Sequence, residues 1–353
     1  MSGTSVVCFE RNLASNPSEN ADLCSMKKQI LSSCVWLLGL TSLWAQPSVS
    51  HEKVTEGVQL HLADPTVVVW NDTYYLTGTD DDNGQHGFPL YSSHDLHTWH
   101  REGTLLSKSR GTWGTRGFWA PQWVVQPDGR WLLLYTANEQ IAVAEATSPC
   151  SPFKGLSGKA LDGSEKNIDP FLLRDDDGRC YLYHVRFDHG NYLWVAEMDM
   201  QRMCIKQETL RRCFTITQPW ELTAAYRSDP IMEGPTVLKL EGKYYMFYSA
   251  NHFLSPDYAV GYAVAETPMG PWRKAGCNPI LHESKRGERG DGHGDVFRGL
   301  DGNLYYVYHV HNSAKKAQPR CTRIARLGYR KTDSGELEFY VDTEQVIKLK
   351  VKN

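Results

Sequence analysis

The sequence predicts an all-β protein, a five-bladed β-propeller with four-stranded antiparallel blades around a central channel. After residue 58 the chain shows short β-rich runs interrupted by Asp-Gly and similar turns, with almost no helical periodicity. One unit recurs five times: an apolar strand, a tight turn, and a second strand rich in tyrosine. The units recur about every 50–65 residues, a period typical of propeller blades.

The five repeat units fill the chain and leave no room for a second domain, so residues 47–353 are expected to form a single propeller. A β-sandwich also contains many short strands, but it would not repeat this unit five times. An acidic run within the third unit, RDDDGR (174–179), is interpreted as a solvated hairpin turn. In chain order the units read DPTVVVWNDTYYLTGT from Asp64, APQWVVQPDGRWLLLYTA from Ala120, DPFLLRDDDGRCYLYHV from Asp169, EGPTVLKLEGKYYMFYSA from Glu233 and GDVFRGLDGNLYYVYHV from Gly294.

The N-terminal region has the features of an export signal. Residues 26–46 contain two lysines and then an apolar stretch that ends at Ala45, which predicts a secretory signal peptide, too short to be a comfortable membrane span. Residues 1–25 are interpreted as an upstream extension from a misplaced start codon. The protein is therefore expected to be secreted or periplasmic. Secretion permits disulfides, and Cys204–Cys213 is the first pair to consider.

Composition narrows the choice of partners. The net charge is −3 and the pI is about 6.5, so nothing indicates a nucleic-acid or membrane partner. The 11 Trp and 18 Tyr residues are enough for core packing and for a minority that stack on sugar rings. The protein is expected to be a monomer.

Acidic residues recur at one position of the repeat, where the inner strands of all blades should meet at one end of the channel. Asp64 and Asp169 directly precede a proline, and Glu233 precedes one after an intervening Gly234. A single acid beside a proline commonly caps a turn, as Asp229 before Pro230 illustrates. Three acids gathered at one opening repel each other and lose hydration, which raises the pKa of one of them. Glycoside hydrolysis requires one protonated and one ionised carboxyl group.

The motifs together resemble glycoside hydrolase family 43 from about residue 58 to residue 330. This resemblance implies a five-bladed propeller that hydrolyses glycosides with inversion, with Asp64 as general base, Asp169 as the acid that tunes the pKa of the proton donor, and Glu233 as general acid. It also implies that His293 lies near a central water or cation, often calcium, although no cofactor is required. Gly234 and Pro235 argue against the related fructan-active branch, which has a cysteine after the acid. The motifs are ADP (63–65), FWAPQ (118–122), NIDPFLLRDDDGRCYL (167–182), EGPTVLKLEGKYYMFYSA (233–250) and GHGDVF (292–297).

Aromatic residues and histidines near the expected mouth are candidates for substrate binding, although each could equally pack between blades. Trp119 is the first candidate, followed by Phe88 and His252. His86, Trp113 and Arg116 are weaker candidates, and segments 79–90 and 107–119 are long enough to wall a pocket.

The expected reaction is removal of terminal α-L-arabinofuranosyl or β-D-xylosyl residues from plant cell-wall polysaccharides or oligosaccharides. An endo-acting arabinanase or a galactan-active enzyme of the same family is the alternative within this chemistry. A non-catalytic carbohydrate-binding propeller is the alternative from a different class.

Overall fold

The computed structural model describes residues 57–352, apart from 109–110, 162–165, 225–228 and 287. The predicted upstream extension (1–25) and signal peptide (26–46) lie outside the described residues. The described part of the chain is almost entirely β, and none of its helices has the length and apolar character needed to span a bilayer. Its short helices are α1 (Glu283–Arg286), η2 (Gln207–Thr209) and η3 (Pro219–Glu221).

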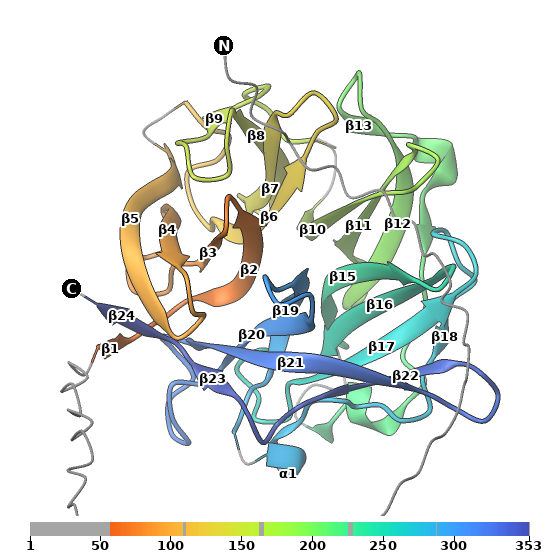
Figure 1. Cartoon of the computed structure of the whole chain (residues 1–353). Helices are drawn as coiled ribbons and strands as arrows, with labels where there is room; N and C mark the ends of the chain where they lie inside the picture. Colours follow the sequence, from red (N-terminus) through yellow and green to blue (C-terminus); the bar gives the residue numbers. More distant parts are fainter. Residues whose placement is uncertain (1–56, 109–110, 162–165, 225–228, 287, 353) are drawn as a thin grey trace, which may run out of the picture. The chain divides into compact units, whose positions relative to one another are not determined.

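Five antiparallel sheets form the five predicted blades (Figure 1). Blade one contains β2 (Ala63–Trp70), β3 (Thr73–Thr79), β4 (Gly87–Ser93) and β5 (Thr98–Ser107). Blade two contains β6 (Trp119–Val125), β7 (Trp131–Ala137), β8 (Gln140–Ala146) and β9 (Lys154–Gly155). Blade three contains β10 (Asn167–Arg174), β11 (Cys180–Phe187), β12 (Asn191–Asp199), β13 (Cys204–Ile205) and β14 (Arg211–Arg212).

The last two blades and the chain ends complete the ring. Blade four contains β15 (Met232–Leu240), β16 (Lys243–Ala250), β17 (Ala259–Ala265) and β18 (Arg273–Lys274). Blade five contains β19 (Gly292–Arg298), β20 (Leu304–Val310), β21 (Cys321–Lys331), β22 (Leu337–Val341) and β23 (Ile347–Lys348). Beyond β23, strand β24 (Lys350–Lys352) pairs in parallel with β5 of blade one and also binds β1 (Val58–Gln59). The C-terminal segment therefore fastens blade five to blade one.

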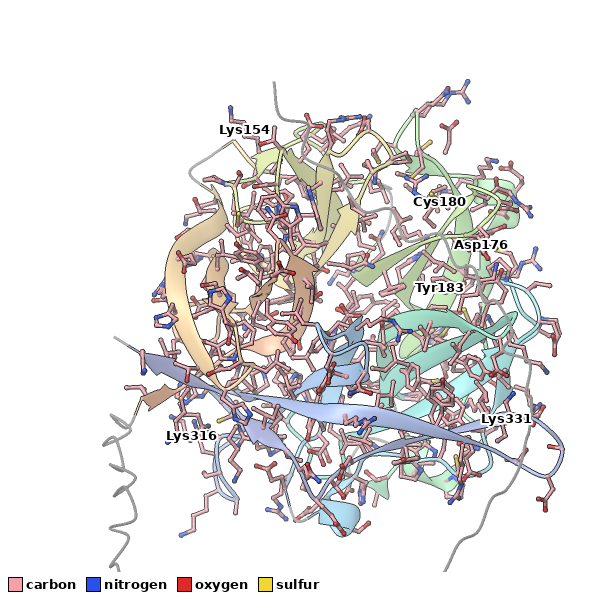
Figure 2. The ribbon with its side chains drawn as sticks, in the orientation of Figure 1. Lys154, Asp176, Cys180, Tyr183, Lys316 and Lys331 are labelled. Atoms are coloured by element: carbon pink, nitrogen blue, oxygen red, sulfur yellow. The ribbon has the colours of Figure 1, made fainter. Side chains whose placement is uncertain are left out.

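The hydrophobic core consists of five clusters, each between two neighbouring blades. Figure 2 shows the side chains and labels one member of two clusters: Cys180 packs between blades two and three, and Tyr183 between blades three and four. Strands in the middle of a blade are covered on both faces, which is why all seven residues of β7 are buried. The apolar, tyrosine-rich runs of the repeat are thus explained by packing between blades.

Every inner strand carries an irregularity at the same place. The strand register shifts at the residue before the repeat's proline, or before Gly294 in blade five. The backbone there has a positive φ, which costs an L-residue about 1–2 kcal/mol and re-aims its side chain. We call these five positions the ring residues: Asp64 (φ +47°), Ala120 (+44°), Asp169 (+56°), Gly234 (+61°) and His293 (+41°).

The prediction that Cys204 and Cys213 form a disulfide is wrong. All six cysteines among the described residues are free. Cys204 pairs with Asp199 at one end of β12, whereas the amide of Cys213 bonds Leu193 near the other end. At about 3.3 Å per residue, roughly 20 Å separates these two positions.

The acidic turn 174–179 is not uniformly solvated. Its first aspartate, Asp175, is buried and accepts bonds of 2.5 Å from Lys239 Nζ and from the Tyr244 hydroxyl. These bonds connect the β10–β11 turn of blade three to blade four.

Candidate active site

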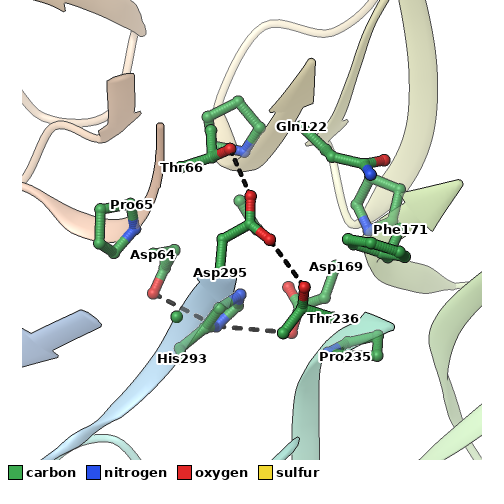
Figure 3. Close-up of a pocket in the computed structure, with 14 residues that line it drawn as sticks. Asp64, Pro65, Thr66, Gln122, Asp169, Phe171, Pro235, Thr236, His293 and Asp295 are labelled. Carbon is green, nitrogen blue, oxygen red and sulfur yellow. Dashed lines mark hydrogen bonds and ion pairs between the residues drawn. The ribbon is translucent and has the colours of Figure 1, made fainter. Parts of the chain in front are cut away.

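The inner strands of all five blades line a narrow cavity at the propeller centre (Figure 3). Its volume is about 30 Å³, enough for about one water molecule. On its wall Asp295 accepts hydrogen bonds of 2.7 Å from the hydroxyls of Thr66 and Thr236. A sugar ring cannot enter this space. The cavity is therefore too small to be the substrate pocket itself.

Asp64 is built to remain ionised. Its Oδ1 lies 3.2 Å from Nη1 of Arg320, and its Oδ2 accepts a 2.6 Å bond from the Thr79 hydroxyl. Burial alone would raise the pKa of Asp64, but the Arg320 guanidinium, together with the neighbouring His293 and His309, outweighs burial and holds this pKa well below its usual range. Arg320 is itself fixed by Asp81, whose carboxylate accepts from Nε at 2.9 Å and from Nη2 at 3.0 Å. An ionised carboxylate in this position can take a proton from water.

Glu233 is built to retain its proton. Burial, together with the negative charge of Asp64, raises the pKa of Glu233 to about 7, although a bond from the Tyr258 hydroxyl opposes the rise. That bond reaches Oε1 at 2.7 Å, and the side chain of Asn191 also bonds the carboxyl group. A carboxylic acid with this pKa can donate a proton near neutral pH.

Asp169, which is expected to tune the pKa of the proton donor, has a raised pKa of its own. Burial and the neighbouring Glu233 and Asp64 raise the pKa of Asp169 well above its usual range. Its Oδ2 accepts a backbone bond, 3.2 Å from the amide of Gly234, and within the described part of the chain no lysine or arginine pairs with it. Asp169 and Glu233 therefore titrate as a coupled pair that retains a proton together. This arrangement still keeps the acid side of the site protonated while Asp64 is charged.

His293 lies between two of the acids, as Figure 3 shows. Its Nδ1 is 3.3 Å from Oδ1 of Asp64 and 3.8 Å from Oδ2 of Asp169. Burial lowers the pKa of His293, so the imidazole is neutral at neutral pH. Across the described ranges, no three His, Cys, Asp or Glu side chains are grouped so as to hold a metal ion.

The predicted substrate-binding residues separate into two groups. Trp119 is half-buried at the start of β6 and donates from its indole nitrogen to Gln85 at 2.5 Å. His252 is half-buried and stacks on Phe253. Burial lowers the pKa of His252, and the nearby charge of Arg320 lowers it further. Both remain candidates.

The prediction that Phe88 binds substrate is wrong, because Phe88 is fully buried. It packs edge-on against Phe118 and Tyr135 in the core between blades one and two, so it cannot contact substrate. Among the weaker candidates, His86 and Arg116 are exposed, and Trp113 packs against the same core.

Four residues that contact the acids, directly or through Arg320, were missed from sequence: Arg320 and His309 at Asp64, Asp81 at Arg320, and Tyr258 at Glu233. Asp81 comes from segment 79–90, which was expected to wall the pocket and also supplies Gln85. Arg320 and Tyr258 lie outside the repeated hairpins. His309 falls within one, but in the tyrosine-rich second strand, where the repeat gave no signal for a site residue.

Three buried carboxyl groups with opposed pKa shifts, gathered at the centre of a propeller, define the protein as a glycoside hydrolase. Comparison with known proteins agrees with this class. The family described as Glycosyl hydrolases family 43 matches residues 58–333, and the chain belongs to this family.

Individual relatives differ in their described activities. The chain is 28% identical to the "Beta-D-galactofuranosidase xynD" of Aspergillus niger, over 73% of this chain and 77% of that protein. It is 25% identical to a "Xylosidase/arabinosidase" of Butyrivibrio fibrisolvens, over 69% of this chain but only 48% of that protein, and so spans about half its length. A solved structure described as an endo-1,4-beta-xylanase of Bacteroides thetaiotaomicron shares 42% identity, with a TM-score of 0.76, over 84% of this chain and 98% of that one.

Proposed function

We propose that the protein is an inverting glycosidase that removes terminal α-L-arabinofuranosyl or β-D-xylosyl residues from plant cell-wall polysaccharides or oligosaccharides. The observation that carries this proposal is the opposed ionisation of two acids at one site. Arg320 keeps Asp64 charged, whereas burial keeps Glu233 protonated up to about neutral pH. The relatives described as xylosidase/arabinosidase support a pentose as the sugar that is released.

In the proposed mechanism Asp64 removes a proton from a water molecule while the oxygen of that water attacks the anomeric carbon. Glu233 donates its proton to the glycosidic oxygen on the opposite face as the bond between that oxygen and the anomeric carbon breaks. Both carboxyl groups finish with the opposite protonation state, and exchange with solvent restores them. Asp169, coupled to Glu233, helps to retain the proton before transfer. Trp119 and His252 are proposed to contact the sugar above the ring residues.

The central experiment measures hydrolysis of aryl pentosides and of xylo- and arabino-oligosaccharides by Asp64→Asn and Glu233→Gln. General acid–base groups typically contribute about 10²–10⁴-fold to the rate, so we expect losses of that size. The loss in Glu233→Gln should be greater for oligosaccharides than for aryl substrates, whose leaving groups need less protonation. Asp229→Asn is the matched control, because Asp229 also precedes a proline but is exposed and outside the ring.

The product's anomeric configuration, followed by NMR, should be opposite to that of the substrate. Full activity on oligosaccharides in both acid variants would refute the assigned roles. Binding of oligosaccharides by the unaltered protein without release of any sugar would instead support a carbohydrate-binding propeller.

Endo action on xylan is the second candidate. It is favoured by the 42% identical structure described as an endo-1,4-beta-xylanase. Time courses on xylan distinguish the two modes, because an exo-enzyme releases monosaccharide from the start, whereas an endo-enzyme first produces a series of oligosaccharides.

A further inference from the structure

The backbone amides of the ring residues follow a pattern around the propeller. Each strained ring residue needs an acceptor for its N–H, because the bulge removes it from the regular strand pairing. In three cases the acceptor is a hydroxyl on the second strand of the preceding blade. These bonds join Ala120 N to Thr79 Oγ1 (3.0 Å), Asp169 N to Thr136 Oγ1 (3.0 Å) and His293 N to Ser249 Oγ (2.7 Å).

Two blades depart from this pattern, and both departures concern the proposed catalytic acids. In blade three the equivalent residue is Val185, which has no acceptor, and the amide of Gly234 bonds the carboxylate of Asp169 instead. In blade five it is His309, whose Nδ1 accepts from the amide of Asp64 at 3.2 Å. His309 is fully buried, and burial lowers its pKa to about 4, so the imidazole is neutral. The same Nδ1 lies 3.3 Å from Oδ1 of Asp64, so both the amide and the carboxylate of Asp64 contact this nitrogen.

A hydroxyl at position 309 would satisfy the amide of Asp64 as it does in the other blades. The imidazole instead leaves its Nε2 buried and without a hydrogen-bond partner among the described residues. A buried unpaired ring nitrogen is unfavourable, so hydrogen bonding alone does not explain an imidazole at this position. Unlike a hydroxyl side chain, the imidazole offers a flat face to Tyr258, whose ring stacks on His309 with 5.6 Å between the ring centroids and an interplanar angle of 11°.

Tyr258 connects this stack to the other side of the reaction. Its hydroxyl donates to Oε1 of Glu233 at 2.7 Å, and its ring is fully buried. The ring lies against Gly292, where an added Cβ would be only 2.0 Å from Tyr258 Cε1. His309 and Gly292 are partners in the β19–β20 ladder, so the two positions that enclose the Tyr258 ring lie opposite each other in one blade.

We propose that His309 and Tyr258 are positioning residues that hold the general base and the general acid in register with each other. The hydrogen bond from the Asp64 amide to the His309 imidazole holds the base, and the hydrogen bond from the Tyr258 hydroxyl to Glu233 holds the acid. The stacked rings join the two. This inference rests on the roles proposed above for Asp64 and Glu233.

The test separates the stack of His309 on Tyr258 from the hydrogen bond between Tyr258 and Glu233. His309→Thr restores the hydroxyl acceptor found in blades one and two but removes the stack. Tyr258→Phe keeps the stack but removes the bond to Glu233. The measurement is the pH dependence of kcat/KM with an oligosaccharide substrate, whose alkaline limb reports deprotonation of Glu233 in the free enzyme.

The Tyr258 hydroxyl stabilises the charged form of Glu233, so its removal should move the alkaline limb to higher pH, by about one pH unit. His309→Thr should move the limb in the same direction and lower kcat, because the phenol loses its support. The double variant should move it no further than Tyr258→Phe alone. Gly292→Ala displaces the Tyr258 ring but leaves the hydrogen bond from the Asp64 amide to His309 in place. This variant should also move the alkaline limb to higher pH.

Tyr262→Phe is the control for loss of a buried phenol, because Tyr262 bonds Phe339 and lies outside the site; its limb should stay at the wild-type pH. An unchanged limb in both His309→Thr and Gly292→Ala, with Tyr258→Phe shifted, would overturn the inference, as would additive shifts in the double variant. Failure of the proposed function has a different signature, since Glu233→Gln would then hydrolyse oligosaccharides at the wild-type rate.

Discussion

Arg320 offers the sharpest test of how the site controls ionisation. Its guanidinium is 5% exposed, touches Asp64 at 3.2 Å and lies 4.6 Å from the Phe253 ring centroid. Two unit charges about 4 Å apart interact by about 4 kcal/mol at an effective dielectric of 20. Asp81 neutralises part of this charge, so Asp64 receives less than the full amount.

Arg320→Met removes the charge and retains an apolar side chain of comparable length. The pKa of Asp64 should rise, because burial is then no longer opposed by the guanidinium. A general base works only when ionised, so the acid limb of kcat/KM should move to higher pH, by about 1–3 pH units. Kinetics with an aryl pentoside between pH 3 and 9 measures this limb.

Two variants separate charge from packing. Arg320→Lys keeps the charge, so its acid limb should stay near that of the wild type. Arg323→Met removes another buried arginine, whose guanidinium lies 2.9 Å from the carboxylate of Glu288 and does not pair with Asp64. It should lower the melting temperature and leave the limb unchanged. A folded Arg320→Met protein, verified by circular dichroism, with an unmoved acid limb would refute the electrostatic role of this residue.

Three further substitutions test the ring, the blade contacts and the core. Gly234→Ala should lose about 1–2 kcal/mol of stability and most oligosaccharide activity, because φ is +61° and the new Cβ would lie 2.8 Å from the His293 ring; wild-type kinetics would contradict this. Tyr244→Phe should lower the free energy of unfolding in urea by about 1.5–3 kcal/mol by removing its bond to Asp175, with kcat unchanged. Phe88→Ala should lower stability by about 3–5 kcal/mol without a specific rise in KM at a temperature where the protein is folded, whereas a rise in KM alone would restore Phe88 to the substrate site.

The fold could be predicted from sequence because its information is local and repeated. Each hairpin carries its own alternation of apolar strand and turn, so five similar units indicate five blades without any knowledge of long-range contacts. The three acids were found in the same way, from their place relative to the repeat's proline. Phe88 shows the limit of this reasoning. An apolar residue near a mouth is equally compatible with packing and with substrate contact, and only its neighbours Phe118 and Tyr135 decide between them.

The sequence predicted that crowding raises the pKa of one acid, but not which residue keeps Asp64 ionised, because that contact crosses the closure of the ring. Arg320 is 256 residues from Asp64 in sequence and reaches it only because blade five closes against blade one. The same closure is tied by Thr322, whose hydroxyl donates to the carbonyl of Leu62, and by the amide of Leu60, which bonds Leu349. The residue that ionises the base therefore lies two positions from a residue that holds the ring together. An opened ring would separate Arg320 from Asp64, so the acid–base asymmetry belongs to the closed propeller and not to any single motif.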